Sequence, residues 1–480
     1  MMEIKNEVLN QDKFNGKKRI LALSAVALGT FMGPLDSSVV NIALPRISDH
    51  YDATIGTVEW VVMSYLLIIS SLLLTYGRLG DMYGHKEIYT YGFVLFTVGS
   101  LLCALAPTIL LLIIFRGVQA IGAGMMMSMG PAIVTNIAPA DKRGRYMGII
   151  AISVSVALTT GPVLGGLLTD KFGWQSIFYI NLPIGVIGYL WAKRVIPDGD
   201  VTKKQSFDIK GAILLFLTLI LLLLPLSYTE KVGWKNFYVI ASLIISFLLL
   251  LFFVYLEKRL REPMIDISVF KNRLFSFGNI SALLSYAAMF FVILIMPFYL
   301  QQLLNLSPSE TGLLFIPMPL TSLIVAPVSG ILSDKIDVRL ISSFGMGFMS
   351  FGLWQLSQLQ YDSSNMTIIL AMITIGFGSG LFQTPNTSAV MGSVPRNRLG
   401  IASSMLATMR NLGMMLGVAI AGAIFTSRYN YLNNNLSEEL NHVSIQAKLF
   451  IEALNLTFIV ASMIALLAVI TSLIRGPLKR

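Results

Sequence analysis

The sequence predicts an all-α integral membrane protein with fourteen spanning helices. Of its 480 residues, 55% are apolar and only 12% are charged, whereas soluble globular domains carry about 25% charged residues. The apolar residues gather in long blocks, and a spanning helix needs about 20 mostly apolar residues. These blocks are too long for barrel strands, and open backbone cannot face lipid, so the spans are helical. A single soluble domain and a disordered chain are therefore excluded.

Fourteen blocks reach this length. They lie at 20–44, 57–77, 88–106, 108–137, 145–168, 176–195, 210–227, 236–256, 275–300, 309–332, 340–359, 366–391, 400–426 and 448–472. The polar start of the chain and the length of the first block differ from a secretory signal, so we expect this block to remain as helix 1.

The net charge of +10 indicates membrane orientation rather than binding of nucleic acid. With the N-terminus inside, 27 of the 35 Lys and Arg residues lie in cytoplasmic segments and six lie in external loops. The positive-inside rule favours this orientation. We expect a monomeric multi-pass protein of the plasma membrane, with both termini in the cytoplasm.

The sequence contains no pattern typical of an enzyme or of a cofactor site. The single cysteine, Cys103, lies in an apolar block, and the three histidines lack metal-ligand spacing. Residues 376–380 are glycine-rich, but they lie inside a block without a preceding strand, which favours helix packing over nucleotide binding. We expect no enzyme activity, no cofactor and no metal.

The two halves of the chain repeat one helix–loop plan. Gly77 and Asp81 follow the second block, and Gly330 and Asp334 follow the tenth, 253 residues later in each case. Parallel repeats of this kind build transporters that rock around a central site. We expect six-helix bundles in residues 1–196 and 274–480. Residues 197–273 would hold a linker and two additional helices.

Four segments resemble motifs of the major facilitator superfamily, in particular of its fourteen-helix drug:proton antiporters. Residues 77–86 resemble the loop 2–3 motif Gly-x-Leu-x-Asp-x-x-Gly-x-Lys/Arg, and residues 35–45 resemble the helix 1 motif. Residues 116–122 resemble Arg-x-x-Gln-Gly-x-Gly with Ala120 replacing a glycine, and residues 161–166 resemble the antiporter motif Gly-Pro-x-x-Gly-Gly. The resemblance covers the whole chain. It implies the major facilitator fold and proton-driven export of drugs or drug-like amphiphilic compounds.

Asp36 and Arg116 are the candidate proton-coupling residues. Asp36 is the only carboxylate well inside an apolar block, and an intramembrane acid is by default a functional-site hypothesis. It lies about 12 Å below the outer end of helix 1, and Arg116 lies at a similar depth in helix 4. The two side chains are therefore expected to pair. The alternative is a static ion pair that only locks the bundle.

Polar residues inside other blocks are candidates for a substrate cavity. They are Asn41, Gln119, Gln383, Asn386, Arg410 and Asn411. A mid-membrane arginine needs a partner or a water-filled cavity, and helix 13 contains no acid, which argues against divalent cationic substrates. Glu59, Glu310 and Glu452 stand near outer helix ends, where rim charges are favoured over a proton path.

Two sets of residues are candidates for conformational motifs. At the cytoplasmic helix ends, a charge clamp between the halves is expected from Gly77, Arg78, Asp81, Gly84 and Lys86, with Asp334 as a degraded second copy. In the outer half of helix 5, a close helix seam is expected from Gly161, Pro162, Gly165 and Gly166. The alternatives are solvated loop charges and simple packing.

The sequence therefore predicts a proton-coupled secondary exporter of amphiphilic compounds that works by alternating access. The nearest alternative is an exporter of one endogenous metabolite or lipid on the same scaffold. An ATP-driven pump would need a separate ATPase subunit, because the chain lacks a phosphate-binding loop. A non-transporting sensor is a further alternative.

Overall fold

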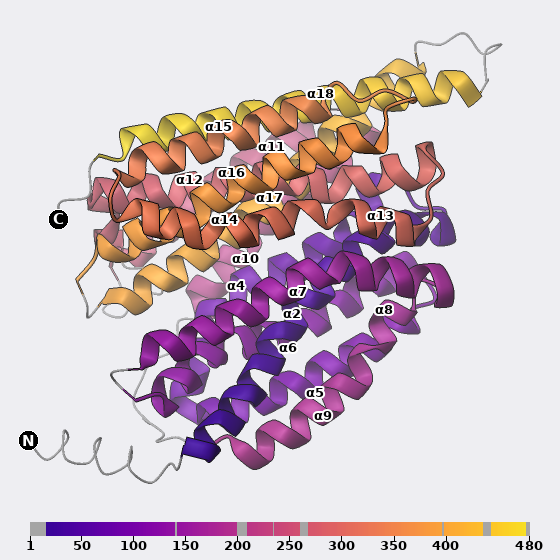
Figure 1. Ribbon diagram of the computed structural model, residues 1–480. Coiled ribbons are helices and arrows are strands. Elements are labelled where there is room, and N and C mark those ends of the chain that lie inside the picture. Colours follow the sequence, from indigo (N-terminus) through magenta and orange to yellow (C-terminus); the bar gives the residue numbers. More distant parts are fainter. Residues whose placement is uncertain are drawn as a thin grey trace, which may run out of the picture.

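A computed structural model describes residues 16–139, 142–198, 209–233, 235–259, 267–395, 398–434 and 443–476. The described chain is helical throughout, and its long helices run side by side (Figure 1). Both chain termini lie at one end of this bundle, which we call the terminal end; the other is the opposite end (Figure 1).

The helices before residue 198 form the first part of the bundle. They are α2 (Gly16–Tyr51), α3 (Ile55–Val58), α4 (Trp60–Tyr83), α5 (His85–Ala104), α6 (Ile109–Ile137), α7 (Arg143–Phe172), α8 (Ser176–Tyr179) and α9 (Asn181–Val195). Helix α2 packs along α7 and also contacts α6 and α9, so it lies at the centre of this part.

The helices from residue 273 onward form the second part. They are α12 (Arg273–Phe298), the π-helical η2 (Tyr299–Leu303), α13 (Pro308–Phe315), α14 (Pro317–Ser333), α15 (Val338–Leu356), α16 (Asn365–Gly392), α17 (Leu399–Asn434) and α18 (Val443–Ile474). Between the parts, α10 (Ile209–Val232) contacts α4 and α17, and α11 (Phe237–Glu257) packs on α10. The short 3-10 helix η1 (Ile267–Lys271) precedes α12.

Eleven helices of the described chain are long and apolar enough to cross a membrane. The expected spans at 176–195, 210–227 and 340–359 correspond to α8 with α9, to α10 and to α15. Helix α9 has only 15 residues, the apolar stretch of α10 with described side chains is Ile213–Leu226, and α15 has 19 residues but does not reach the required hydropathy. The described residues thus show a multi-pass membrane protein, with fewer clear spans than the fourteen predicted.

The repeat seen in the sequence recurs in the packing. A Cβ on Gly92 of α5 would lie 2.9 Å from the carbonyl oxygen of Gly122 in α6. A Cβ on Gly345 of α15 would lie 2.7 Å from that of Gly378 in α16. Gly92 and Gly345 are again 253 residues apart, so α5 with α6 and α15 with α16 make equivalent close contacts.

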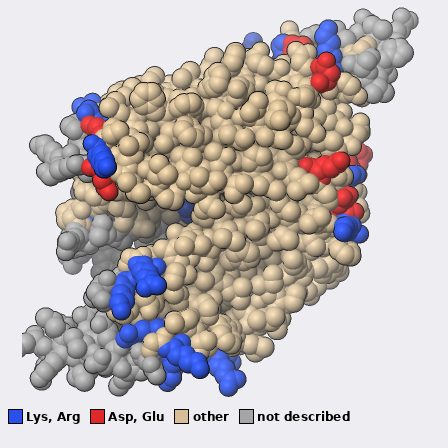
Figure 2. Space-filling view, in the orientation of Figure 1, with Lys and Arg blue, Asp and Glu red and all other residues tan. Residues whose placement is uncertain are grey.

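The surface separates apolar and charged residues along the bundle. Figure 2 shows a broad uncharged band, with Lys, Arg, Asp and Glu confined to the two ends of the visible face. Lys and Arg gather at the terminal end of the first part (Figure 2). A hydrocarbon layer about 30 Å thick would cover the uncharged band.

Candidate functional site

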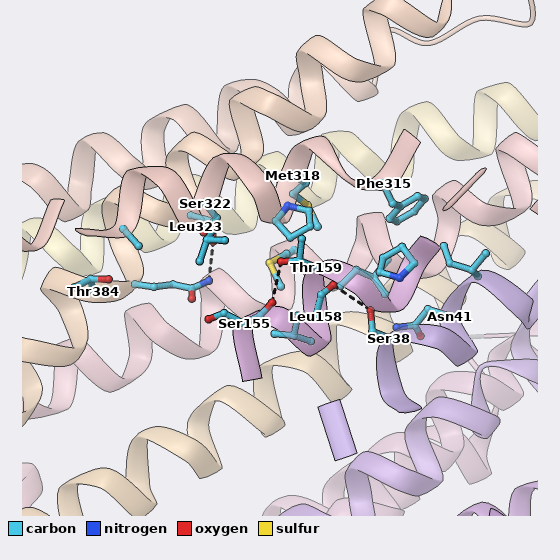
Figure 3. A pocket seen from close by; sticks show the side chains of 18 residues that line it. Ser38, Asn41, Ser155, Leu158, Thr159, Phe315, Met318, Ser322, Leu323 and Thr384 are labelled. Atoms are coloured by element: carbon cyan, nitrogen blue, oxygen red, sulfur yellow. Dashed lines mark hydrogen bonds between the residues drawn. The ribbon is translucent and has the colours of Figure 1, made fainter. Parts of the chain in front are cut away.

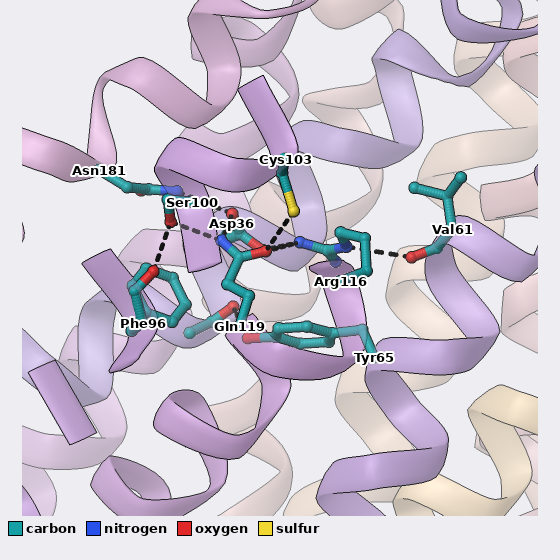
Figure 4. A network of polar contacts seen from close by, with 10 residues as sticks. Asp36, Val61, Tyr65, Phe96, Ser100, Cys103, Arg116, Gln119 and Asn181 are labelled. Atoms are coloured by element: carbon teal, nitrogen blue, oxygen red, sulfur yellow. Dashed lines mark hydrogen bonds and ion pairs between the residues drawn. The ribbon is translucent and has the colours of Figure 1, made fainter. Parts of the chain in front are cut away.

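A buried polar network lies inside the first part of the bundle (Figure 4). Asp36 on α2 and Arg116 on α6 are 1% and 0% exposed, and Arg116 Nη1 donates to Asp36 Oδ2 across 2.5 Å. The expected pairing of these two residues is present. Because neither charge reaches water, each depends on its partner for stabilisation.

Neutral partners complete the network around the ion pair. Asp36 Oδ1 accepts hydrogen bonds from Gln119 Nε2 and from Asn181 Nδ2, each at 2.8 Å. Gln119 Nε2 also donates to Ser100 Oγ at 2.7 Å, and Gln119 Oε1 accepts from Arg116 Nη1 at 2.5 Å. Gln119 is thus a member of this network, because it lies one helical turn after Arg116 on the same face of α6.

Backbone and aromatic groups fix the guanidinium. Arg116 Nε donates to the carbonyl oxygen of Val61 on α4 at 3.0 Å, and the guanidinium carbon lies 4.2 Å from the centre of the Tyr65 ring. These contacts hold the planar group in one orientation, which a lysine could not reproduce.

The internal repeat does not copy this ion pair into the second part. At the repeat offset of 253 residues, Asp36 and Arg116 correspond to Met289 and Ile369. Both counterparts are apolar, so the second part has no copy of the pair at these positions.

A cavity of about 260 Å³ lies between the two parts (Figure 3). Its 18 lining residues come from α2 and α7 on one side and from α12, α13, α14 and α16 on the other. They are Ser38, Asn41, Ile42, Ser155, Leu158, Thr159, Pro162, Met289, Ile293, Phe315, Met318, Pro319, Ser322, Leu323, Ala326, Ser379, Gln383 and Thr384. Hydroxyl and amide groups alternate with apolar ones, and none of the 18 is charged.

Two of the expected cavity residues, Asn41 and Gln383, line this cavity. Asn386 does not. Its Oδ1 accepts from Arg475 Nη1 at 2.8 Å and its Nδ2 donates to the Gly278 carbonyl at 3.0 Å. Asn411 is also outside the lining, although it is buried.

Arg410 is half-buried on α17 and does not line the cavity. On the helical wheel, it lies between the direction of Gly413, which packs on α12, and that of Gly422, which packs on Glu59 at the start of α4. The position of Arg410 on α17 thus lies between the face that packs on the second part and the face that packs on the first part.

Arg475 forms a second buried polar cluster that the sequence did not reveal. It lies directly after α18 at the terminal end, is 1% exposed, and donates to Val338 O at 2.6 Å and Ser342 Oγ at 3.0 Å. Burial lowers the pKa of Arg475 to about 10, so it stays charged at neutral pH. Its partners belong to α15 and α16, which this one side chain joins to α18.

The loop 2–3 motif is described only in part. Gly84 has a φ of 99°, a conformation that favours glycine, and it separates α4 from α5. Lys86 Nζ pairs with Asp198 Oδ1 at 2.7 Å. The side chains of Arg78 and Asp81 lie outside the described residues, and Gly77 makes only an ordinary contact with Ser128.

The second copy of this motif has its own local geometry. Asp334 is exposed at the end of α14. Asp337 caps α15, since its Oδ1 accepts from the Arg339 backbone N–H at 2.9 Å and its Oδ2 from the Arg339 guanidinium at 2.8 Å. The hydrogen bond from Arg339 lowers the pKa of Asp337.

The helix 5 motif forms a close seam at the opposite end. A Cβ on Gly165 would lie 2.7 Å from the Val39 carbonyl oxygen on α2, and one on Gly161 would meet Ser38 at 2.5 Å. A Cβ on Gly166 would lie 2.3 Å from the Pro308 carbonyl oxygen at the start of α13. The motif therefore packs α7 against α2 and against the second part.

Pro162 takes part in the same seam. A Cβ on Gly312 of α13 would lie 2.3 Å from the Pro162 carbonyl oxygen. Three hydrogen bonds also join the parts at this end. They are Gln301 Nε2 to Ile42 O at 2.8 Å, Gln302 Nε2 to Asp49 Oδ1 at 2.9 Å, and Ser309 Oγ to Asp170 Oδ2 at 2.7 Å.

The outer-end acids have different surroundings. Glu310 forms a capping box with Ser307 at the start of α13, and Glu452 pairs with Arg428. Glu59 is fully buried, and its carboxylate lies where a Cβ on Gly422 of α17 would be. Glu310 and Glu452 thus have local structural roles, whereas Glu59 is a buried group at the junction of the parts and not a rim charge.

The bundle of apolar helices around a central cavity defines a membrane transport protein. The Major Facilitator Superfamily model matches residues 26–418 and 278–479, and the chain therefore belongs to this superfamily. The solved structures show the same fold. An inward-facing bacterial homologue of the human lysosomal transporter Spinster superposes with a TM-score of 0.72 at 14% identity, covering 96% of this chain and 98% of that one.

Similar proteins of known sequence are named as transporters. The chain is 37% identical over 416 residues to the riboflavin transporter RibZ of Clostridioides difficile, covering 86% of this chain and 90% of that protein. It is 30% identical over 435 residues to the multidrug transporter protein MdtP of Bacillus subtilis, covering 90% and 80%. It is 32% identical over 412 residues to the multidrug resistance protein Stp of Mycobacterium tuberculosis, covering 86% and 76%.

Proposed function

We propose that the protein is a proton-coupled secondary transporter that exports amphiphilic compounds by alternating access. The observation that carries this proposal is the Asp36–Arg116 pair, which is buried within spanning helices and includes a residue of α2, the helix that borders the polar cavity. A carboxylate inside the membrane carries a free-energy cost, and such residues usually have a function. Proton relays are one common function. The relatives named as multidrug transporters support export of drug-like compounds.

The moving units are bundles in residues 1–196 and 274–480, with residues 197–273 holding a linker and the two additional helices of a fourteen-helix antiporter. The distribution of Lys and Arg supports an orientation in which the terminal end faces the cytoplasm, and in this proposal the protein acts as a monomer in the plasma membrane. With this orientation the seam at the opposite end lies on the external side, and its close contacts support an inward-facing conformation.

The energy available to one proton is sufficient for export. One pH unit is equivalent to about 1.4 kcal/mol and 100 mV to about 2.3 kcal/mol, which together sustain a several-hundred-fold gradient.

Arg78, Asp81, Lys86 and Asp334 would clamp the parts on the cytoplasmic side in the alternate state. Arg410 and Asn411 would contact the solute as it passes between the parts.

A second candidate function is export of one endogenous metabolite, and riboflavin is the first to test. The 37% identity to a protein named riboflavin transporter favours it, and so does a cavity lined by hydroxyl and amide groups. Purified protein in liposomes with an imposed pH gradient would be supplied with an uncharged amphiphilic dye or with riboflavin. Uphill movement of both indicates a broad exporter, uphill movement of riboflavin alone indicates the metabolite exporter, and no proton-driven movement of any solute contradicts the proposal.

A further inference from the structure

The buried ion pair and the cavity lie on opposite faces of α2. Counting 100° per residue from Asp36, the cavity-lining Ser38, Asn41 and Ile42 lie at about 200°, 140° and 240° around the helix. The three α2 side chains that border the cavity therefore point to the side of the helix opposite Asp36. Figure 3 shows Ser38 and Asn41 at the cavity, and Figure 4 shows Asp36 within the first part.

The carboxylate is also closed off by its own partners. Oδ2 accepts from Arg116, and Oδ1 accepts from Gln119 and Asn181. These donors stand on α6 and α9, and none of them lines the cavity. Neither Asp36 nor any of these partners is among the cavity-lining residues, so a solute in the cavity does not contact the carboxylate.

The cavity offers hydrogen bonds without charge. Its polar groups are hydroxyls on four helices, such as Ser155 and Ser322, and the amides of Asn41 and Gln383. Gln383 Nε2 donates to Ser379 Oγ at 2.7 Å, which leaves its carbonyl oxygen available to a solute. The apolar side is formed by Phe315, Met318 and others, which suit a flat or aliphatic body.

We infer that the cavity selects solutes that have no net charge and carry several hydrogen-bonding groups. In this inference, a proton on Asp36 affects the cavity only by displacing α2. Solute and proton do not compete for Asp36. A permanent cation finds no counter-charge among the 18 described lining residues, and entering the cavity uncompensated carries a desolvation cost. This inference rests on the proposed function for the direction of transport, but the charge selectivity of the cavity is independent of it.

The test measures charge selectivity without knowledge of the natural solute. In a Cys103→Ala background, Ser38→Cys places a nearly isosteric thiol on the cavity face of α2, two residues from Asp36. Purified protein is reacted with two small methanethiosulfonates, one cationic (trimethylammonioethyl) and one neutral (hydroxyethyl). The ratio of the cationic to the neutral rate is then compared with the ratio for a free thiol. A second reporter, Ser155→Cys, reads the same cavity from α7.

We expect Asp36→Asn to change this ratio by less than twofold at both reporters. Gln383→Glu adds a carboxylate to the cavity and should raise the ratio about tenfold, the effect of a unit charge at short range in a partly aqueous site. Ser322→Asp serves the same purpose if Gln383→Glu fails to fold.

Three outcomes overturn the inference. The first is a fall in the ratio with Asp36→Asn that matches the rise with Gln383→Glu, because the cavity would then sense Asp36 directly. The second is a parent ratio well above that of a free thiol. The third is no reaction at either reporter. Failure of the proposed function appears separately, as absence of proton-driven flux in the Cys103→Ala parent.

Discussion

Arg116 on α6 donates to Asp36 on α2 across 2.5 Å, and both side chains are removed from water within the membrane span. The pair joins the helix that borders the cavity to one that does not. Any change in the protonation of Asp36 alters the attraction between these helices, since protonation removes one of two mutually stabilising charges. In the proposed function, a proton on Asp36 would act through the position of α2.

Replacing Asp36 by Asn should abolish uphill export and leave downhill exchange of solute. The amide keeps the shape of the carboxyl group but cannot titrate. Solute-induced proton release from purified protein should disappear over the tested pH range. Asp52→Asn, which changes an exposed acid just beyond α2, is the matched control and should behave as the parent. Proton release equal to that of the parent in Asp36→Asn would show that Asp36 is structural.

Replacing Arg116 by Lys should slow transport and shift its pH dependence. Lysine keeps the positive charge, but its single ammonium cannot reach Asp36, Gln119 and the Val61 carbonyl in the fixed geometry of a guanidinium. The measurement is initial efflux rate against pH in liposomes. A lower rate with an unchanged pH profile would indicate that Arg116 affects folding or packing and not proton coupling.

The sequence identified the ion pair because charge inside an apolar block is rare and depth along a helix is calculable. It did not identify Asn181 or Ser100, since polar residues near helix ends and small hydroxyls inside helices are common in membrane proteins. The prediction that Asn386 lines the cavity was wrong. Its partner, Arg475, is 89 positions away, and no sequence pattern links the two residues. Pairings of this kind depend on helix packing in three dimensions, whereas the helices themselves follow from local composition.

Replacing Gly312 by Ala should open the opposite end of the bundle. The new Cβ would lie 2.3 Å from the Pro162 carbonyl oxygen, and a backbone atom cannot move aside without separating α13 from α7. A cysteine at Thr159 in the cavity should then be labelled faster by an impermeant thiol reagent added outside intact cells.

Gly148→Ala is the control for this experiment. Gly148 lies on α7, and a Cβ there would meet no atom within 4 Å. Labelling of the Thr159 cysteine should match that of the parent. If Gly312→Ala and Gly166→Ala both leave labelling unchanged, the seam is not what closes the cavity.

The proposed orientation predicts which loops react from outside. In a Cys103→Ala background, single cysteines at Ser363 and Asn434 should react with an impermeant reagent in intact cells. A cysteine at Lys335, at the terminal end, should react only after the membrane is permeabilised. The reverse pattern would contradict cytoplasmic termini.

Replacing Arg475 by Ala should lower the melting temperature of the purified protein by several degrees. Removal of the guanidinium leaves Asn386 Oδ1 and the Ser342 hydroxyl without this buried partner, and each such group costs about 1–3 kcal/mol. Arg475→Lys should recover part of the loss, because the charge is kept but one of the contacts is not. Arg339→Ala, which alters a partly exposed partner of Asp337, should lower stability far less. Equal melting temperatures for Arg475→Ala and Arg339→Ala would show that the cluster does not hold α15, α16 and α18 together.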